Sequence, residues 1–155
     1  MTRIGLISDT HGLLRPEAVS FLSGCDHIIH AGDIGKREIL ERLAQIAPVT
    51  AVRGNNDTDA WADALSETEL TKFGRVSVYA VHDIAQLDID PMKAGVRAVV
   101  SGHSHKPGIK DRDGVLYVNP GSAGPRRFRL PISIGELLID GDAIEPRLMQ
   151  LDCRQ

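Results

Sequence analysis

The chain has few aromatic residues, few cysteines and no long apolar run. Phe, Trp and Tyr make up 4% of its 155 residues, and its two cysteines are Cys25 and Cys153. Two cysteines without CxxC spacing exclude a disulfide framework and a cysteine-based metal site. The apolar N-terminal run over residues 1–7 is too short for a secretory signal or a membrane span, and neither end carries a lipidation motif. We therefore expect a reduced cytoplasmic protein without a membrane segment.

The chain also lacks a strong excess of charge of either sign. Its 18 Lys and Arg against 21 Asp and Glu give a formal charge of -3. This balance is not that of a non-specific nucleic-acid binder. The apolar share of 42% is that of a globular chain with a core. Since no repeat or linker divides the sequence, we expect a single domain over residues 1–155.

The first third of the chain alternates between short apolar runs and amphipathic segments. The runs over residues 4–8, 26–30 and 49–52 are typical of buried strands. Helices are predicted between them, one opening at Pro16 and one with the apolar stripe Ile39, Leu40, Leu43, Ile46 and Ala47. This order predicts a partly parallel sheet with right-handed crossovers.

The remainder of the chain is richer in predicted strands. They cover residues 67–73, 75–81, 98–101, 109–112, 115–118, 132–139 and 143–151, with turns such as Asp113-Gly114 between several of them. Only residues 84–94 have a helical pattern, and Pro91 weakens it. We therefore expect an α/β fold in which the second half is mostly β.

Five of the predicted strands are followed by polar clusters. These clusters contain Asp9 and His11, Gly32-Asp33, Gly54-Asn55, His82-Asp83, and Gly102-His103-Ser104-His105. Ligands of open α/β sheets bind outside the carboxyl ends of the strands, so the clusters predict one shared site. Carboxylate, imidazole and amide groups together suit divalent transition metals. Taken singly, Asp33 has a local explanation as a helix cap and Gly54-Asn55 as a turn, and only the ordered series favours a site.

The series resembles the signature of the calcineurin-like metallophosphoesterases, which runs DxH, GDxx, GNxx, a histidine and GHxH. The match extends from Asp9 to His105, and Asn119-Pro120-Gly121-Ser122 resembles a segment of the small YfcE-type branch. The resemblance implies a four-layer α/β sandwich, in which two mixed β-sheets are flanked by helices.

The resemblance also implies a site with two divalent ions. Asp33 would bridge them, and a hydroxide between the ions would attack phosphorus in line. Asn55 would bind the phosphate oxygens, so that Asn55, Asp33 and His82 would carry the catalysis. The implied metal is manganese, with nickel, zinc or iron as alternatives. One ion would be held by Asp9, His11 and His105, and the other by Asn55, His82 and His103.

The implied activity is hydrolysis of a small phosphodiester. The alternatives are a phosphomonoesterase, a nucleotide pyrophosphohydrolase, and a non-catalytic metal-binding scaffold such as the retromer subunit that has this fold. All seven ligand positions hold competent side chains, which favours an enzyme. The resemblance further implies a homodimer or tetramer, with Trp61, Phe73 or Phe128 as interface candidates.

Two residues depart from the family pattern. Asn56 stands where many members have a histidine, and because an amide cannot donate a proton as an acid, poor alkoxide leaving groups should react slowly. Asp83 stands where relatives commonly have glycine, and we expect it to orient His82 or to alter access to the second metal. Asp57 either orients loop or ligand groups or caps a turn.

Three further residues remain open from sequence alone. His30 either supports the site or packs as a hydrogen-bonded strand residue. Arg126 and Arg127 either contact a substrate phosphate or form a solvated pair of charges.

Overall fold

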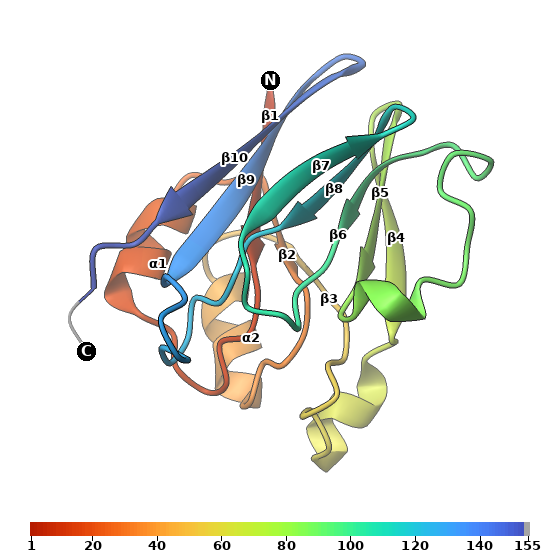
Figure 1. Cartoon of the computed structure of the whole chain (residues 1–155). Coiled ribbons are helices and arrows are strands. Elements are labelled where there is room, and N and C mark those ends of the chain that lie inside the picture. The colour runs from red at the N-terminus through yellow and green to blue at the C-terminus, as the bar shows by residue number, and fades with distance from the viewer. Residues whose placement is uncertain (154–155) are drawn as a thin grey trace.

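The computed structural model describes residues 1–153 and arranges them around two five-stranded β-sheets (Figure 1). The first sheet has the strand order β10-β9-β1-β2-β3. Its strands β1 (Thr2–Ile7), β2 (His27–His30) and β3 (Val49–Ala51) are parallel, as the sequence predicted. Strands β9 (Ser133–Asp140) and β10 (Ala143–Gln150) run antiparallel beside β1. The first sheet is therefore mixed.

The second sheet has the order β4-β5-β6-β8-β7 and is also mixed. Strands β5 (Val76–Val81), β6 (Val96–Val100) and β8 (Val115–Asn119) are parallel. Strands β4 (Thr68–Phe73) and β7 (Gly108–Arg112) are its antiparallel edges. The two sheets confirm the predicted metallophosphoesterase-type α/β sandwich.

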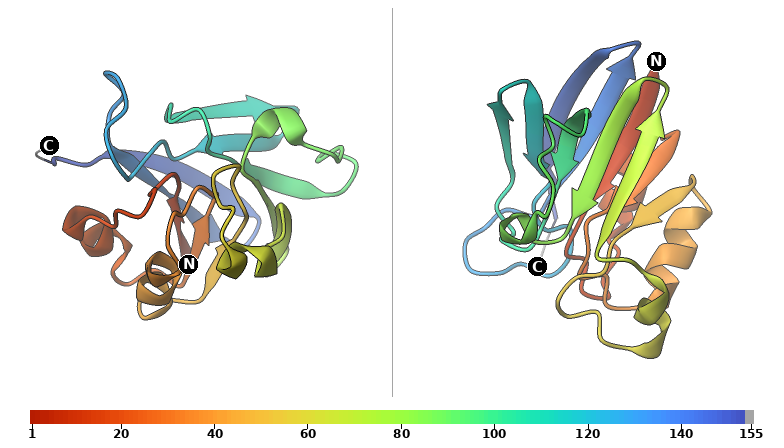
Figure 2. Two further views of the ribbon diagram at one scale, coloured as in Figure 1. Left: turned by 90° about the horizontal axis from the view of Figure 1, so that it is seen from below. Right: turned by 90° about the vertical axis from the view of Figure 1, so that its right-hand side faces the viewer.

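Alternating side chains bury both faces of the first sheet. Ile4 and Leu6 of β1 pack with Val78 and Val100 of the second sheet in the central core. On the other face, Ile7 packs in a separate cluster together with residues of helices α1 (Pro16–Leu22) and α2 (Arg37–Ala44). Figure 2 shows these helices on the outer side of the first sheet. The period of two along β1 thus divides its side chains between two cores.

The prediction of a helix over residues 84–94 is wrong. A single 3-10 turn, η2 (Ile84–Gln86), forms there and Leu87 is already extended. Leu87 and Ile89 pack against the outer face of the second sheet. Because these two residues are two positions apart, an extended chain can bury both, and Pro91 has no backbone N–H for a helix. A short irregular segment therefore covers this face where the sequence pattern indicated a helix.

The aromatic residues considered for an interface have different environments. Phe73 packs against the central core, and Trp61 packs against the cluster beneath the helices from a second 3-10 turn, η1 (Ala60–Ala64). Phe128 is 87% exposed. Cys25 and Cys153 are free thiols. None of the helices in residues 1–153 has both the length and the apolar character needed to cross a membrane.

Candidate metal centre

The predicted ligands follow β1, β2, β3, β5 and β6, at the carboxyl ends of these strands. Backbone hydrogen bonds connect the loops that carry them. The Asp9 N–H donates to the Gly32 carbonyl at 3.0 Å, and the Gly102 N–H donates to the His82 carbonyl at 2.9 Å. Each of these bonds joins two loops of the same sheet, and the His103 N–H, which donates to Asp9 Oδ2 at 3.1 Å, connects the loops of the two sheets.

Two of the motif glycines are explained by close packing around the carboxylates. A methyl group added at Gly54 would overlap the backbone nitrogen and the carboxylate of Asp33. A methyl group at Gly102 would overlap Ser8 and the carboxylate of Asp9. Each glycine therefore lets the loop after one strand pass directly against a carboxylate that follows another strand.

Backbone strain is concentrated at the candidate ligands. A positive φ is uncommon for residues other than glycine, and its cost is tolerated where the surrounding structure enforces it. In residues 1–153, seven such residues occur, and five of them are predicted ligands: Asp9, His11, Asp33, His103 and His105. The backbone thus holds these side chains in an otherwise unfavourable arrangement, as functional sites often do.

One group of candidate ligands comprises Asp9, His11 and His105. The His105 Nε2 lies 3.4 Å from Asp9 Oδ1 and 3.4 Å from His11 Nε2. The His11 Nε2 is 3.8 Å from the same Asp9 oxygen. One carboxylate oxygen and two imidazole nitrogens therefore converge, as was expected for the first ion.

A second group comprises Asp9, Asp33 and His82. The His82 Nε2 lies 3.2 Å from Asp33 Oδ2 and 3.9 Å from Asp9 Oδ1. The Asp33 Oδ2 is also 3.8 Å from the His11 Nε2, so it lies between the two groups. Asp9 belongs to both groups, and the two carboxylates therefore share the central position that was expected of Asp33 alone.

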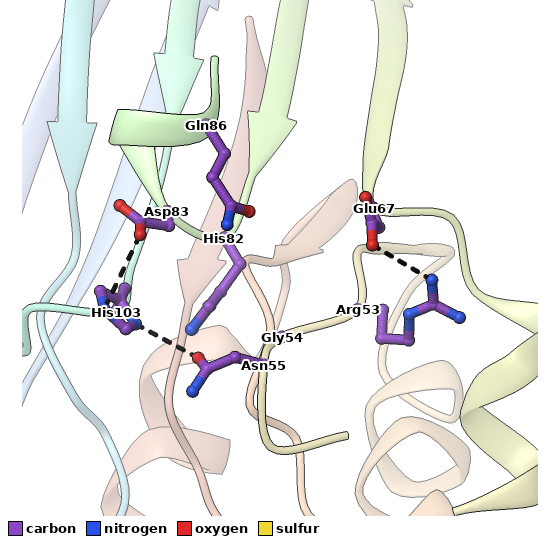
Figure 3. A pocket seen from close by; sticks show the side chains of 8 residues that line it. All are labelled: Arg53, Gly54, Asn55, Glu67, His82, Asp83, Gln86 and His103. Atoms are coloured by element: carbon purple, nitrogen blue, oxygen red, sulfur yellow. Dashed lines mark hydrogen bonds and ion pairs between the residues drawn. The ribbon is translucent and has the colours of Figure 1, made fainter. Parts of the chain in front are cut away.

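Asn55 and His103 form a pair beside these groups. The Asn55 Oδ1 lies 3.2 Å from the His103 Nδ1, and the rings of His103 and His82 are 5.2 Å apart (Figure 3). Asp83 faces the other nitrogen of His103, with its Oδ2 at 3.8 Å from Nε2. Asp83 was expected either to orient His82 or to alter access to the second metal. It contacts His103 and not His82, because neighbouring residues of an extended segment point in opposite directions.

The donor atoms at the centre fit a cation. Among the described residues, three buried side-chain atoms have no hydrogen-bond partner, and all three belong to candidate ligands: Asp9 Oδ1, His82 Nε2 and His105 Nδ1. The His82 Nδ1 lies 2.7 Å from the Ala31 carbonyl, to which it donates, so the lone pair of Nε2 is directed at the carboxylates. A metal-ligating histidine is usually oriented by such a bond to its other nitrogen. The arrangement therefore suits metal binding.

The electrostatics of the centre also favour positive charge. Burial acts to raise the pKa of Asp33, but the adjacent His82 imidazole, the hydrogen bond from the Asn56 N–H and the nearby His11 imidazole lower it to about 2. Burial acts to lower the pKa of His82, but the Asp33 and Asp9 carboxylates raise it above its ordinary value. Burial raises the pKa of Asp9, and the Ser8 hydroxyl that donates to it acts in the opposite direction. The two carboxylates thus stabilise a cation between them.

Asp57 and Asn56 support the loop that carries Asn55. The buried carboxylate of Asp57 accepts hydrogen bonds from the backbone N–H groups of Ile34, Gly35 and Gly54 at 2.9 to 3.2 Å. Asp57 therefore orients the loops of two candidate ligands, which was one of its two expected roles. The Asn56 amide donates to Asp33 Oδ2 at 3.1 Å.

His30 is fully buried beneath the site as a neutral imidazole. Its Nδ1 accepts from the Gly32 N–H at 3.1 Å. The Thr10 hydroxyl donates to the Ile34 carbonyl, so it accepts from the His30 Nε2 at 3.0 Å. Burial lowers the pKa of His30 to about 3, and a proton on Nδ1 would remove the acceptor for Gly32. His30 thus combines the packed role and the supporting role that the sequence left open.

We expect stability to fall in acid because of His30. Its pKa is lower in the folded chain than in the unfolded chain, so its contribution is complete above about pH 6.5 and is lost as the pH falls toward 3. Urea denaturation at pH 7 and pH 5 measures this loss. Between these two pH values, the free energy of unfolding of the wild-type chain should fall by about 2 kcal/mol more than that of His30→Gln. Equal losses in both chains would contradict this account.

Sequence reasoning missed three residues that line a pocket beside Asn55, His82 and His103. Arg53, Glu67 and Gln86 form part of its wall, and the Arg53 guanidinium lies 3.3 Å from the Glu67 carboxylate (Figure 3). Arg53 directly precedes Gly54, which is the one signal that could have identified it. Glu67 and Gln86 carry no such signal, since both reach the pocket through tertiary packing.

Comparisons with curated proteins find archaeal relatives along nearly the whole chain. A probable metallophosphoesterase of Methanothermobacter thermautotrophicus is 34% identical, and the match covers 95% of this chain and 91% of the relative. A second probable metallophosphoesterase, from Methanocaldococcus jannaschii, is 37% identical over 96% of this chain and 81% of its own. A phosphodiesterase of the same organism is 25% identical over 77% of this chain and 82% of its own.

Solved structures share the fold. A predicted phosphoesterase from Streptococcus pneumoniae aligns with a TM-score of 0.77 and 25% identity, over 96% of this chain and 89% of that one. Vps29 from Chaetomium thermophilum aligns with a TM-score of 0.79 and 17% identity, over 97% of both chains. The family model for the calcineurin-like phosphoesterase superfamily domain matches residues 2–142. The five ligand-bearing loops and these similarities lead to one conclusion, that the chain belongs to the calcineurin-like phosphoesterase superfamily.

Proposed function

We propose that the chain is a phosphodiesterase that uses two divalent metal ions, manganese in the first instance. The observation that carries the proposal is the position of Asp33 Oδ2, 3.2 Å from the His82 Nε2 and 3.8 Å from the His11 Nε2. A carboxylate between two sets of imidazoles is suited to join two cations and to offset their repulsion. The oxygen and nitrogen donors suit manganese, nickel, zinc or iron.

Each predicted ligand has a role in this proposal. When bound, the ions lower the pKa of a coordinated water toward about 7 and withdraw charge from the phosphoryl oxygens. Asp33 joins the two sets of ligands, and the Ala31 carbonyl keeps His82 in the orientation that binds metal. The Asn55 amide nitrogen can donate to a phosphate oxygen, because its Oδ1 is turned to His103. One ion is assigned to Asp9, His11 and His105, and the other to Asn55, His82 and His103.

The preference for diesters with acidic leaving groups rests on Asn56. Its amide donates to Asp33, and an amide cannot protonate a departing alkoxide. Good leaving groups need no such proton. The similarity to the Methanocaldococcus jannaschii phosphodiesterase supports diester chemistry.

The test is a comparison of p-nitrophenyl substrates before and after metal removal. We expect turnover of bis(p-nitrophenyl) phosphate to exceed that of p-nitrophenyl phosphate, to disappear with a chelator and to return with manganese. A series of aryl diesters should show a rate that falls steeply as the pKa of the leaving group rises.

Other results would replace this function with one of its alternatives. Faster turnover of the monoester would indicate a phosphomonoesterase, and hydrolysis confined to nucleotide anhydrides would indicate a pyrophosphohydrolase. Bound metal without turnover of any of these substrates would indicate a non-catalytic scaffold. A flat dependence on leaving-group pKa would contradict the role given to Asn56.

A further inference from the structure

Positive charge is concentrated on one part of this acidic chain. Residues 102–131 contain six of the 18 Lys and Arg but only two of the 21 Asp and Glu, a formal charge of +4 in a chain of -3. Within residues 1–153, none of these six cations has a carboxylate within ion-pair distance, whereas Arg3, Arg53 and Arg147 do. All six are exposed, and we call them the basic surface: Lys106, Lys110, Arg112, Arg126, Arg127 and Arg129.

The β7–β8 hairpin supplies one arm of the basic surface. Lys110 and Arg112 are two residues apart on β7 and so point to the same side of the sheet. The Arg112 guanidinium lies over the Tyr117 ring, 5.4 Å from its centre. Lys106, Lys110, Arg112 and Tyr117 line one hollow together with Ser104. This arm is therefore a groove with cations along it and an aromatic ring in its wall.

The loop between β8 and β9 supplies the other arm. Phe128 is 87% exposed at φ 54°, an unfavourable backbone conformation for an aromatic residue. The base of the loop is fixed to the metal centre, because the Ser122 hydroxyl donates to the Asp9 carbonyl at 3.0 Å. The Arg15 guanidinium also holds the Gly124 carbonyl. The loop thus presents an aromatic ring and arginines from a base anchored on a candidate ligand.

The two arms meet at the GHSH loop of the metal centre. Ser104 and Lys106 line both the hollow of the hairpin and the hollow of the Phe128 loop. Ser104 lies between the candidate ligands His103 and His105 in the sequence. Both views in Figure 2 show the hairpin and the loop on the same side of the molecule. The basic surface is therefore continuous and passes the candidate ligands.

We propose that the basic surface binds single-stranded oligonucleotide, which would make an oligonucleotide the substrate of the proposed phosphodiesterase. Cleavage of the oligonucleotide rests on the proposed phosphodiesterase function, whereas its binding does not. A groove of unpaired cations follows a phosphodiester backbone, and an exposed aromatic ring such as that of Phe128 stacks on bases without sequence preference. A mononucleotide would reach only one arm. The overall charge of -3 conceals this surface, because acidic residues elsewhere outweigh it.

The test measures the affinity of the chain for a fluorescein-labelled oligothymidylate of about ten nucleotides. Binding is detected by fluorescence anisotropy, in a buffer that contains a chelator. We expect binding that weakens steeply between about 50 and 200 mM salt. The double variant Lys110→Glu/Arg112→Glu should bind at least about tenfold more weakly, with a log–log salt slope that is shallower by about 1.4. Phe128→Ala should weaken binding by roughly tenfold with little change of slope.

The matched control is Arg37→Glu/Arg75→Glu, which makes the same charge change at exposed residues of α2 and the β4–β5 turn. It should retain most of the affinity. Equal loss in both double variants, no binding at low salt, or a mononucleotide that binds as tightly would overturn the proposal. So would binding to phosphatidylserine vesicles but not to the oligonucleotide. Because turnover is not measured, loss of the phosphodiesterase proposal would leave this result unaffected, and the reverse also holds.

Discussion

Asp33→Asn is expected to lower turnover of bis(p-nitrophenyl) phosphate by at least about a hundredfold and to leave the fold intact. The substitution removes the negative charge that lies between the His82 and His11 nitrogens. It keeps Oδ1, which accepts from the Asn56 N–H at 2.9 Å. The new amide would face the His82 Nε2 and could donate to it. Steady-state kinetics and circular dichroism of the same preparation measure both effects.

The control for this variant is Asp59→Asn, which removes a carboxylate of the same kind from an exposed residue before η1. Its activity should equal that of the wild-type chain. Calorimetry with manganese should show weaker metal binding by Asp33→Asn than by Asp59→Asn. Activity of Asp33→Asn near the wild-type level would refute a carboxylate that joins two ions.

Asp57→Ala is expected to lower the free energy of unfolding by about 3 kcal/mol and manganese affinity by about ten- to a hundredfold. The substitution leaves three backbone N–H groups, of Ile34, Gly35 and Gly54, without their acceptor. These groups belong to the loops that carry Asp33 and Asn55, so the ligands lose their orientation together. Urea denaturation and calorimetry with manganese measure the two effects.

The control for the second variant is Asp63→Ala, at an exposed position of η1. It removes a carboxylate without a backbone partner, and stability should change by less than about 0.5 kcal/mol. If Asp57→Ala and Asp63→Ala were equally stable, Asp57 would be a turn residue without the supporting role described above.

The sequence predicted the part of the fold that depends on local patterns. The apolar runs before Asp9, Asp33 and Asn55 form the parallel strands β1, β2 and β3. The run is clearest in β1, where residues 4–7 are buried on both faces of the sheet and are all apolar. The segment after His82 could not be predicted in the same way. Ile84 and Leu87 are spaced for one face of a helix, whereas Leu87 and Ile89 are spaced for one face of an extended chain, and only packing on the second sheet decides between them.

The candidate site also has features that the sequence predicts and features that only the folded chain shows. Its ligand types and order were visible in the sequence, since each ligand belongs to a polar cluster that follows a predicted strand. The contacts of Asp57 with Gly35 and of Asp83 with His103 were not visible, because these partners are 22 and 20 residues away and are reached only in the folded chain. The basic surface was hidden for a similar reason, as its cations come from a hairpin and a loop that meet at Ser104.

The most direct test of the account is the number of manganese ions that the metal-free wild-type chain binds. Calorimetry, with metal analysis of the dialysed product, should give two ions per chain, and Asp33→Asn should hold fewer. One ion per chain in the wild type, or equal binding by the variant, would contradict a centre in which Asp33 joins two sets of ligands.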